Sequence, residues 1–577
     1  MSVTHMNNNI IVQWRYWFFL VLLCICAFAL LYRAVDLHVF EQAFLAEQGD
    51  ARTIRFETLE AHRGMITDRH GEPLAISAPV ETIYADPKFL NLSLSQLTAL
   101  AKILEVSPDW LAKKINSNQD KRFIYLKRKM APHEVEKVLA LNLDGVYSQR
   151  EYKRYYPSGE VVAHVLGFTS IDGQGQEGLE LAYDQWLTGK VGKKRVLKNR
   201  KGKVIKDFGE FEEAQAGHDI KLSLDMRIQY LAYRELKAAV ETHRARSGSI
   251  VILDVKSGDI LAMANQPSYN PNNRSTIDVS HLRNRAITDV FEPGSTMKLA
   301  TIAAALESKK YTLKTELDTS PGFIRLGKKS IRDHRDYGVL SLMDIIAKSS
   351  NVGTSRIALS LSGDVVWDMF YRLGFGQGTG IGFPGESIGQ LPDSSSWRPI
   401  EVATMSYGYG MNVNALQLAQ AFMIYGNGGI KYPLSLVYRE KVLEGEQEGE
   451  QVFAGAISTD LKTAMQAVVA KGGTGTRAQL PLYDVGGKSG TVHSVGKHGY
   501  EKSQYKAIFA GVAPADKPEI AMVVIIDAPA GAEYYGGEVA APVFSRVVDG
   551  TMRLLNVRPD KGIAKSIPVS KLDEKRG

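Results

Sequence analysis

The strongest constraint on this chain is the segment YWFFLVLLCICAFALLY at residues 16–32, which contains no charged residue. Seventeen residues at helical rise span roughly 25 Å, close to the roughly 30 Å hydrocarbon core of a bilayer. Trp14 and Tyr32 lie at the two ends of the segment, and aromatic rings favour the membrane interface. We therefore predict a transmembrane anchor over residues 16–33, preceded by a short cytoplasmic tail at residues 1–15.

Two other interpretations of this segment compete with an anchor. A cleaved signal peptide is favoured by Ala27-Phe28-Ala29, which resembles a cleavage site, but the apolar run continues past that point. A lipoprotein would need a small residue before its modified cysteine, whereas Leu23 and Ile25 precede the two cysteines. We therefore favour an uncleaved anchor with the rest of the chain exported across the membrane.

Cysteine usage and net charge exclude several classes of protein. Cys24 and Cys26 are the only cysteines, and both lie inside the apolar segment, so the exported part can form neither a disulfide framework nor a cysteine-based metal site. The histidines show no H-E-x-x-H pattern, and we expect no metal and no cofactor. The net charge of +7 favours anionic surroundings such as membrane headgroups or acidic wall polymers, and no nucleic-acid-binding pattern accompanies it.

A chain of 577 residues is too long for one ordinary domain. The loop EEAQAGHDIKLSLD at residues 212–225 separates two regions of different pattern. We expect an elongated, mainly β or α+β domain at residues 34–217. A second α+β domain should follow at residues 218–558, with an antiparallel sheet sandwiched by helices, and a polar tail at residues 559–577.

The expected elements follow from the spacing of apolar residues. Residues 91–145 show helical, amphipathic spacing. VILDV and ILAMA, joined by Lys-Ser-Gly-Asp, predict a hairpin, and residues 226–243 predict an amphipathic helix. Apolar helices are expected at residues 296–308 and 340–360, before the late strands YKAIFAGVAP and EIAMVVIID.

The stretch FEPGSTMKLA contains Ser295 and Lys298 at a spacing of three. Two further Ser-x-x-Lys matches begin at Ser494 and Ser503, but both lie in a polar segment with no face to bury. Ser295 instead follows Pro293-Gly294, which is typical of a helix start, and precedes an apolar helix. Context therefore selects Ser295 from the three.

A serine hydroxyl is a poor nucleophile unless a base activates it, and lysine is such a base only when burial or nearby cations lower its pKa. On a helix, positions three apart share a face, so the Lys298 amine should lie near the Ser295 hydroxyl. The backbone N–H of Ser295 at the helix start is not used by the helix and can point at a ligand. The pattern alone does not decide between a catalytic and a structural serine.

Two partner motifs follow Ser295 in the chain. Residues 348–354, KSSNVGT, offer Ser349 and Asn351 at the end of an apolar run, and Lys488-Ser489-Gly490-Thr491 precede a strand-like stretch. Each motif also has a second copy by chance, at Ser268-Tyr269-Asn270 and at Lys256-Ser257-Gly258. Chance does not readily supply all three motifs in this order, with each motif on a helix or strand that suits it.

This combination resembles the penicilloyl serine transferases, whose motifs are S-x-x-K, S-x-N and K-[ST]-G. The resemblance implies that Ser295 is the acylated nucleophile and Lys298 its general base. It further implies that Ser349 relays a proton to the leaving group, that Asn351 holds the substrate amide, and that Lys488 approaches Ser349.

The K-S-G-T strand should bind the substrate. Ser489 and Thr491 share one face of a strand, where their hydroxyls could hold a terminal carboxylate. Gly490 lacks the Cβ that would keep the substrate backbone away. In the family, the Ser295 and Thr491 N–H groups would form the oxyanion hole. Strict alternation places Lys488 on the opposite face, so its approach to Ser349 is implied by the resemblance alone.

The resemblance extends beyond the catalytic motifs. RGMITDRHGEPLA at residues 63–75, RYYPSGEVVAHVLGF at 154–168 and GQEGLE at 175–180 are similar to motifs of the class B penicillin-binding proteins, in a pedestal or dimerisation-like domain. Soluble β-lactamases are shorter, and the E-D-x-x-F-x-x-H motif of a class A glycosyltransferase domain is absent. Another enzyme should therefore polymerise the strands that this chain cross-links.

Within class B, residues 405–422 and 533–544 resemble the division-specific, penicillin-binding protein 3 type, and Asn351 agrees with that type. Tyr534 and Tyr535 could form an aromatic wall beside the nucleophile or belong to an ordinary packed loop. A basic residue commonly follows K-S-G-T in the family, whereas this chain has Val-His-Ser; we favour an exposed His493 over one at the cleft rim.

The resemblance implies an inner-membrane peptidoglycan D,D-transpeptidase of the division septum, which acts through a serine acyl-enzyme and is inhibited by β-lactams. Its implied partners are lipid-linked glycan strands with D-Ala-D-Ala stems, an FtsW-like polytopic glycan polymerase and other division proteins. The alternatives are a membrane-anchored β-lactamase or D,D-carboxypeptidase, an elongation-type class B enzyme, and a non-catalytic division scaffold.

Overall fold

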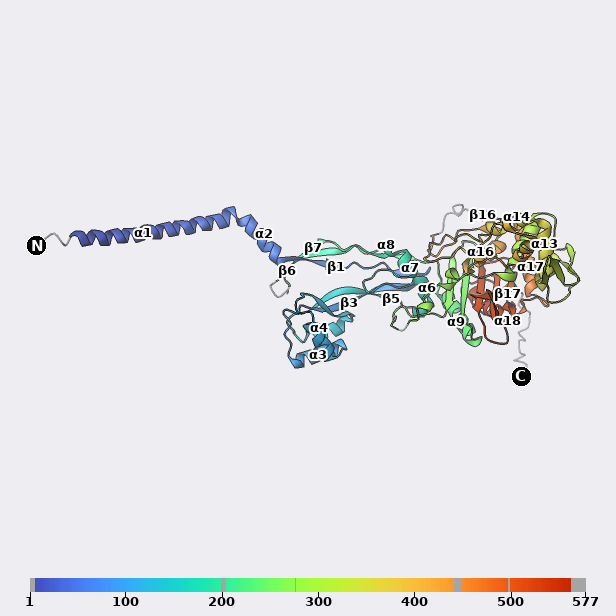
Figure 1. Cartoon of the computed structure of the whole chain (residues 1–577), viewed down its shortest axis with the longest axis horizontal. Coiled ribbons are helices and arrows are strands. Elements are labelled where there is room, and N and C mark those ends of the chain that lie inside the picture. Colours follow the sequence, from blue (N-terminus) through green and yellow to red (C-terminus); the bar gives the residue numbers. More distant parts are fainter. Residues whose placement is uncertain (1–5, 199–203, 276, 441–448, 497–498, 562–577) are drawn as a thin grey trace, which may run out of the picture. The chain divides into compact units, whose positions relative to one another are not determined.

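A computed structural model of the chain describes residues 6–198, 204–275, 277–440, 449–496 and 499–561 (Figure 1). The chain forms two compact units, and each unit is built from three separate segments. Unit 1 comprises Met1–His62, Pro79–Tyr152 and Gly189–Ala216, and unit 2 comprises Arg63–Ala78, Lys153–Thr188 and Gly217–Gly577. The loop at residues 441–448 and the tail beyond residue 561 lie outside the described residues.

The apolar segment near the N-terminus is helical. Helix α1, Met6–Val35, continues into a π-helical turn at Asp36–Phe40, and α2 follows at Gln42–Thr53. Residues Gln13–Phe40 are long and apolar enough to cross a membrane, and none of this stretch is buried against the rest of the chain. The structure therefore fits the predicted single-pass anchor.

Unit 1 contains two sheets. In the first sheet, β6 pairs antiparallel with β1 on one side and with β7 on the other. In the second, β3 pairs with β4 and β5. The bounds of these strands are β1 Ile54–Leu59, β3 Pro73–Ala85, β4 Ile124–Met130, β5 Val146–Tyr155, β6 Gly192–Lys198 and β7 Val204–Glu212.

The helices of unit 1 show where the sequence prediction was incomplete. Helices α3 Leu94–Leu104, α4 Pro108–Asn116 and α5 Pro132–Leu139 lie in the stretch predicted to be helical, but strand β4 interrupts it. Ile124 and Leu126 on β4 are buried while Tyr125 is exposed, which is the period of a strand. Because β4 is short and lies between helices, its alternating pattern was not distinguished from the helical spacing of the residues around it.

Unit 2 is built around a five-stranded antiparallel sheet in the order β10-β9-β19-β18-β17. The predicted hairpin is confirmed as β9–β10, and the two late apolar runs are β18 and β19. The bounds are β9 Ser247–Asp254, β10 Ile260–Gln266, β17 Gly486–Gly496, β18 Gly499–Ala513 and β19 Ile520–Asp527.

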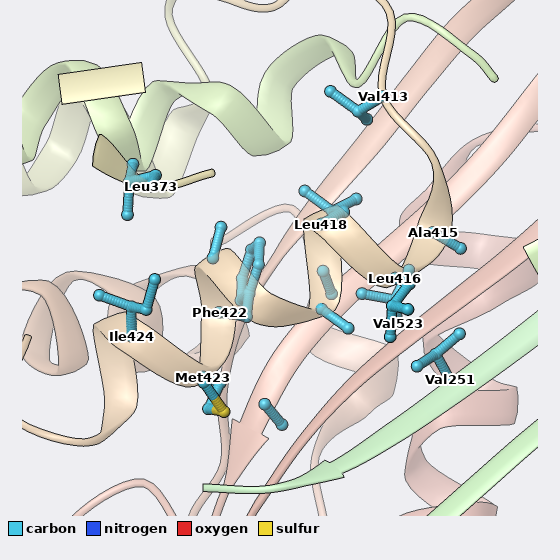
Figure 2. Close-up of a cluster of buried hydrophobic side chains, with 14 of the residues drawn as sticks. Val251, Leu373, Val413, Ala415, Leu416, Leu418, Phe422, Met423, Ile424 and Val523 are labelled. Carbon is cyan, nitrogen blue, oxygen red and sulfur yellow. The ribbon is translucent and has the colours of Figure 1, made fainter. Parts of the chain in front are cut away.

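Helices cover both faces of this sheet, which explains why β9, β10 and β19 are buried at almost every position. Ile250 and Ile252 pack in one cluster with the helices α9, Met226–Thr242, and α18, Gly536–Leu554. The intervening Val251 packs in the other cluster, against α16, Ala415–Gly426 (Figure 2). Successive side chains of a strand point to opposite faces, so each position has a covering helix. The predicted α+β arrangement, with the sheet between helices, is confirmed.

The helices between the hairpin and the late strands carry the residues expected to be functional. A 3₁₀ turn at Gly294–Met297 leads into α11, Lys298–Glu307. The helix predicted over residues 340–360 is two helices, because Ser349 adopts a left-handed conformation and the Ser350 side chain caps the next helix. The remaining helices of at least seven residues are α12 Leu342–Lys348, α13 Asn351–Leu361, α14 Gly363–Arg372, α15 Pro399–Met405 and α17 Gly455–Val469.

Short elements complete unit 2. Strand β2 pairs in parallel with β8 at the start of the long C-terminal segment, and the other short strands form two-residue to four-residue ladders. Their bounds are β2 Ile66–Thr67, β8 Ile220–Lys221, β11 Glu316–Asp318, β12 Phe323–Leu326, β13 Lys329–Arg332, β14 Val339–Ser341, β15 Ile430–Lys431 and β16 Glu450–Gln451, with short helices α6 Ala163–Leu166, α7 Gly178–Ala182, α8 Asp184–Leu187 and α10 Arg285–Thr288.

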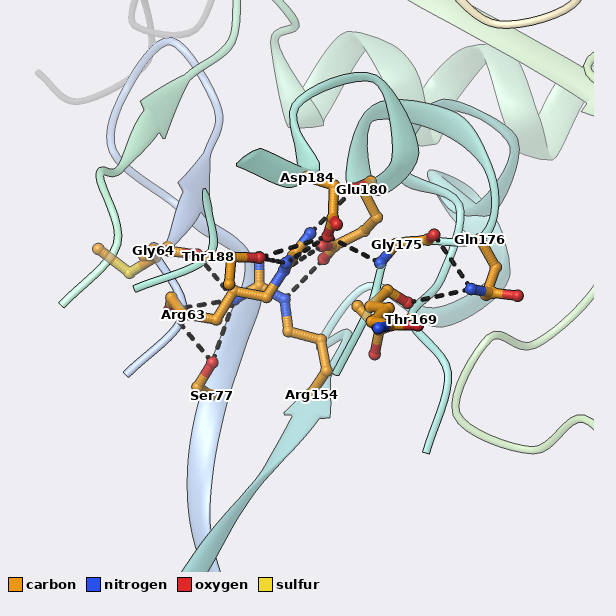
Figure 3. A network of polar contacts seen from close by, with 12 residues as sticks. Arg63, Gly64, Ser77, Arg154, Thr169, Gly175, Gln176, Glu180, Asp184 and Thr188 are labelled. Carbon is orange, nitrogen blue, oxygen red and sulfur yellow. Dashed lines mark hydrogen bonds and ion pairs between the residues drawn. The ribbon is translucent and has the colours of Figure 1, made fainter. Parts of the chain in front are cut away.

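A buried ionic network in unit 2 joins the three N-terminal motifs of the sequence (Figure 3). Arg63 begins the first motif, Arg154 begins the second and Glu180 ends the third. The Nε atoms of Arg63 and Arg154 donate to the two carboxylate oxygens of Glu180 at 2.7 and 2.6 Å. All three side chains are buried, and Glu180 is completely inaccessible. These motifs therefore do more than form turns, because each contributes a charged side chain to one buried set of ion pairs.

Further hydrogen bonds extend this network. Arg63 donates to Asp184 and Thr188, both at 2.7 Å, and to the backbone oxygen of Glu180. Arg154 donates to the backbone oxygen of Gly64 at 2.8 Å. Each guanidinium thus has both charged and neutral acceptors, which is the condition under which buried arginine is tolerated.

Candidate active site

Ser295 lies on the 3₁₀ turn that precedes α11. Its side chain is partly exposed, whereas its neighbours Thr296, Met297 and Lys298 are buried. Gly294 has a φ of +56°, and a Cβ there would come within 2.3 Å of the Val492 side chain. Only glycine fits this position, so the tight turn presents the Ser295 hydroxyl while the following helix is fixed in the core.

Lys298 is completely buried, and its amine faces Ser349. Within the described residues, its two hydrogen bonds go to the backbone oxygen of Ser349 at 2.5 Å and to the Ser349 hydroxyl oxygen at 3.0 Å. Neither bond goes to the Ser295 hydroxyl, and the predicted nearness of the Lys298 amine to that hydroxyl stays a prediction. Burial, together with the nearby charge of Lys488, holds the pKa of Lys298 well below its ordinary value.

Lys488 approaches the same serine from strand β17. Its amine donates to the Ser349 hydroxyl oxygen at 3.0 Å and to the backbone oxygen of Ser489 at 3.1 Å. A hydroxyl oxygen has two acceptor sites, so the two amines can occupy both and leave the Ser349 proton free for donation to another group. The approach that the family resemblance implied is present, and burial lowers the pKa of Lys488 to about 7.

The two buried lysines predict that the stability of unit 2 rises with pH. An unfolded lysine binds a proton up to about pH 10.4, whereas folded Lys488 releases it above pH 7, so unfolding takes up protons in between. Each such lysine contributes up to about 1.4 kcal/mol per pH unit to the unfolding free energy in this window. We expect Lys488→Met to reduce this slope between pH 7.5 and 9.5, and exposed Lys314→Met to leave it unchanged, in urea titrations of the full chain. Equal slopes in all three proteins would contradict the buried neutral lysine.

Asp333 holds the Ser-Ser-Asn motif in place. One of its carboxylate oxygens accepts the backbone N–H of Asn351 at 2.5 Å and that of Val352 at 3.1 Å. The other accepts the Ser350 hydroxyl at 2.5 Å. A carboxylate at the start of α13 satisfies backbone donors that the helix leaves open. No motif marks Asp333 in the sequence, and only the fold brings it to Asn351.

The Asn351 side chain lies on the same side as this aspartate. Its Nδ2 donates to the backbone oxygen of Arg332 at 3.1 Å. This bond fixes the plane of the amide, so its orientation is set before a ligand arrives.

The hydroxyl groups of the K-S-G-T strand are hydrogen-bonded to neighbouring segments. The Ser489 hydroxyl donates to Thr474 at 2.9 Å, and the Thr491 hydroxyl accepts the backbone N–H of Gly536 at 3.0 Å. A Cβ at Gly490 would meet the backbone oxygen of Pro293 and the Thr296 side chain, both at 3.2 Å. Gly490 therefore lets β17 approach the nucleophile turn closely, and the room that it leaves for substrate backbone stays a prediction.

A row of aromatic rings extends from β17 across β18 to the two tyrosines that precede α18. The ring centroids of His493 and Tyr505 are 4.5 Å apart, those of Tyr505 and Tyr534 4.4 Å, and those of Tyr534 and Tyr535 4.4 Å. Tyr535 is also in edge contact with His334, the residue after Asp333. The expectation of an exposed His493 is wrong, because its ring is half-buried against Tyr505 and it lies 3.3 Å from the Glu501 backbone oxygen.

Glu292, three residues before Ser295, connects the nucleophile turn to the β17–β18 hairpin. One of its carboxyl oxygens accepts the backbone N–H of Gly410 at 2.9 Å and the Tyr500 hydroxyl at 3.0 Å. Burial raises the pKa of Glu292 above its ordinary value. Sequence reasoning missed this residue, since a lone glutamate beside a proline carries no signal of its burial.

The site is thus a partly exposed serine at a helix start, beside a hydroxyl that two buried amines contact. This arrangement fits the class of acyl-transferring serine enzymes in which a lysine takes the place of histidine as the basic group. The sequence matches the penicillin binding protein transpeptidase domain over residues 248–549 and the penicillin-binding protein dimerisation domain over residues 58–222. The chain belongs to the penicillin-binding protein family of peptidoglycan D,D-transpeptidases, as its motifs predicted.

Relatives match along nearly the whole chain. It is 42% identical to the peptidoglycan D,D-transpeptidase FtsI of Escherichia coli strain K12, covering 95% of this chain and 93% of the relative. It is 39% identical to the probable peptidoglycan D,D-transpeptidase PbpC of Pseudomonas aeruginosa, covering 95% and 96%. The predicted resemblance to the penicillin-binding protein 3 type is therefore confirmed.

Solved structures agree with these relatives. The apo transpeptidase domain of Burkholderia pseudomallei penicillin-binding protein 3 is 38% identical with a TM-score of 0.54, covering 59% of this chain and 97% of that chain. Penicillin-binding protein 3 of Mycobacterium tuberculosis in complex with aztreonam is 25% identical with a TM-score of 0.68, covering 87% and 98%.

Proposed function

We propose that this transpeptidase cross-links stem peptides of the septal cell wall through an acyl-enzyme on Ser295. The observation that carries the proposal is the buried contact of Lys298 and Lys488 with the Ser349 hydroxyl, beside the exposed end of the nucleophile turn. A neutral amine can accept a proton and a shared hydroxyl can pass one on. The names of the FtsI relatives support the septal role.

Acylation then proceeds by two proton transfers. Ser295 loses its hydroxyl proton to neutral Lys298 as its oxygen attacks the carbonyl carbon of the penultimate D-Ala. The oxyanion is held by the Ser295 and Thr491 backbone N–H groups. When the amide bond breaks, Ser349 donates its proton to the departing D-Ala nitrogen and is reprotonated by a lysine. An amine of a second stem peptide attacks the ester, forms the cross-link and frees Ser295.

Substrate binding falls to residues around this centre. Ser489 and Thr491 hold the terminal carboxylate of the donor stem, and their bonds to Thr474 and to the backbone of Gly536 fix the two hydroxyls beforehand. The Asn351 amide binds the stem backbone. Tyr534 and Tyr535 form an aromatic wall, supported by the stacking of Tyr505 on Tyr534.

β-Lactams resemble the D-Ala-D-Ala donor and should acylate the same serine. The test is intact-protein mass spectrometry of the full chain in detergent after incubation with a penicillin, with tryptic mapping of the adduct. We expect a stable penicilloyl mass on the peptide containing Ser295 and no adduct in Ser295→Ala. No adduct with intact drug would indicate a scaffold, and no adduct with hydrolysed drug would indicate a β-lactamase.

The cellular setting is also proposed. The apolar helix and the FtsI relatives support an inner-membrane protein at the division septum, whose bulk is periplasmic. An FtsW-like polymerase and other division proteins are the proposed partners, because the two domains that the chain matches serve cross-linking and dimerisation, and cross-linking needs strands that have been polymerised. We retain the domain limits at residues 34–217 and 218–558 as proposals.

A further inference from the structure

Unit 1 contains a cleft of about 680 Å³ that the chemistry of unit 2 does not use. Its volume is within the roughly 300–1,000 Å³ that is typical of small-ligand sites. Its walls come from β1 and the residues that follow it, the end of β3, the turn before β4, β5 and β6. Both sheets of unit 1 therefore contribute to one concave surface, which we call the unit 1 cleft.

Aromatic rings from three separate elements form one wall of the unit 1 cleft. Tyr84 stacks on Phe123 with ring centroids 4.7 Å apart and planes at 28°. Tyr147 lies on Tyr84 at 5.5 Å and 32°. The Phe123 side chain nevertheless remains 42% exposed. A cluster that served only the core would not leave its outer ring open to solvent, so this wall offers an aromatic surface to a ligand.

The charged groups that line the unit 1 cleft balance one another. Glu57, Glu60 and Asp86 supply carboxylates, and the cations are Arg122, Arg150 and Lys194. A cleft for a polyanion would have an excess of cations, as required to neutralise phosphates. This lining instead suits a ligand with little net charge and many hydroxyl and amide groups. Carboxylates accept hydrogen bonds from hydroxyl groups, and guanidinium groups donate hydrogen bonds to carbonyl oxygens.

The Tyr84 hydroxyl adds a donor to this lining. Burial and the neighbouring carboxylate of Glu57 raise the pKa of Tyr84 to about 12. The hydroxyl therefore keeps its proton at any physiological pH. The aromatic wall thus offers a flat ring face together with a permanent hydrogen-bond donor.

We propose that the unit 1 cleft is a second, non-catalytic site that binds the amino-sugar backbone of a glycan strand. A pyranose ring presents weakly positive C–H groups on its face and hydroxyl and acetamido groups at its edge. The former suit the negative face of an aromatic ring, and the latter suit the carboxylates and cations of the lining. The saccharide class follows from the cleft itself, whereas its identity as peptidoglycan glycan rests on the proposed function.

The test uses the full chain in detergent, first acylated with penicillin so that unit 2 cannot bind substrate. Chitohexaose, an uncharged β-1,4-linked N-acetylglucosamine hexamer, is the probe, and binding is measured by saturation-transfer difference NMR and calorimetric titration. We expect binding to the acylated wild type. Phe123→Ala should weaken it about two- to tenfold, the range for loss of one aromatic contact.

The matched control is Phe56→Ala, which removes an exposed ring of unit 1 that lies against Phe211 at a tilt of 58°, outside the cleft lining. This variant should bind as wild type does. A double variant, Tyr84→Ser with Phe123→Ala, should lose binding and retain penicillin acylation, which reports an intact unit 2.

Three results would overturn the proposal: no binding of chitohexaose, binding that is indifferent to Phe123→Ala, or Phe123-dependent binding of a free stem peptide in place of the saccharide. The last result would make the cleft a peptide site. None of these affects the Ser295 adduct, so failure here is distinguishable from failure of the proposed function.

Discussion

Replacing Lys298 with methionine is expected to lower the rate of penicillin acylation by roughly 10²–10⁴-fold, the contribution typical of a positioned general base. The lysine is completely buried and its pKa is well below the ordinary value. At a given pH, a larger fraction of this lysine is therefore neutral, and able to accept a proton, than of a free lysine. Methionine has a similar volume and no charge, so the core should tolerate it. The measurement is the acylation rate constant with a fluorescent penicillin, read by gel or stopped flow.

Lys314→Met is the matched control for this experiment. Lys314 is exposed in the same unit, so the same substitution is made there without touching the site. Its acylation rate should equal that of wild type. If Lys298→Met also acylates at the wild-type rate, the base is another group, and Lys488 would be the first to replace, since it contacts the same hydroxyl.

The second large effect is expected in the buried network of unit 2. Glu180→Gln removes the charge that both Arg63 and Arg154 contact, and leaves two guanidinium groups buried without it. Breaking a buried ion pair in this way costs about 3–5 kcal/mol. We expect the urea midpoint for loss of penicillin binding to fall accordingly, while the acylation rate in the absence of urea stays near that of wild type.

Glu177→Gln is the control here, because Glu177 lies three residues away and is exposed. It should shift the midpoint little. A Glu180→Gln midpoint equal to this control would mean that the network contributes nothing to stability. A normal midpoint with slow acylation would instead assign Glu180 a role at the active site, which the structure does not suggest.

Much of the candidate site could be predicted because its residues come in short motifs. Ser295 and Lys298 are three apart, and Ser349 and Asn351 are two apart, so each pair could be found from local spacing alone. Two apolar runs joined by the turn Lys-Ser-Gly-Asp likewise predicted the β9–β10 hairpin, whose strands are buried at almost every position.

The remaining features depend on contacts between distant residues. Asp333 reaches Asn351 through a turn that no motif marks, and Glu292 meets Tyr500 across about 200 residues. The direction of the Lys298 amine is set by the left-handed backbone of Ser349, which residue type alone did not indicate. Strand β4 was missed for a different reason, since its short alternating pattern is averaged with that of the neighbouring helices.

The strand order of the central sheet has a consequence for how the molecule is made. β19 lies between β9 and β18, although it is the last strand of the described residues. β2 pairs with β8, and two segments of unit 1 lie between these strands in the sequence. Neither pairing can form until the later segment has emerged, and contacts of such long separation slow folding. If the chain is exported as proposed, Ile66 lacks its partner Ile220 until β8 has crossed the membrane, and β9 lacks its neighbour β19 until nearly all of the chain has crossed. Penicillin binding should be the last property that a newly exported molecule acquires, after a period in which periplasmic chaperones and proteases compete for it.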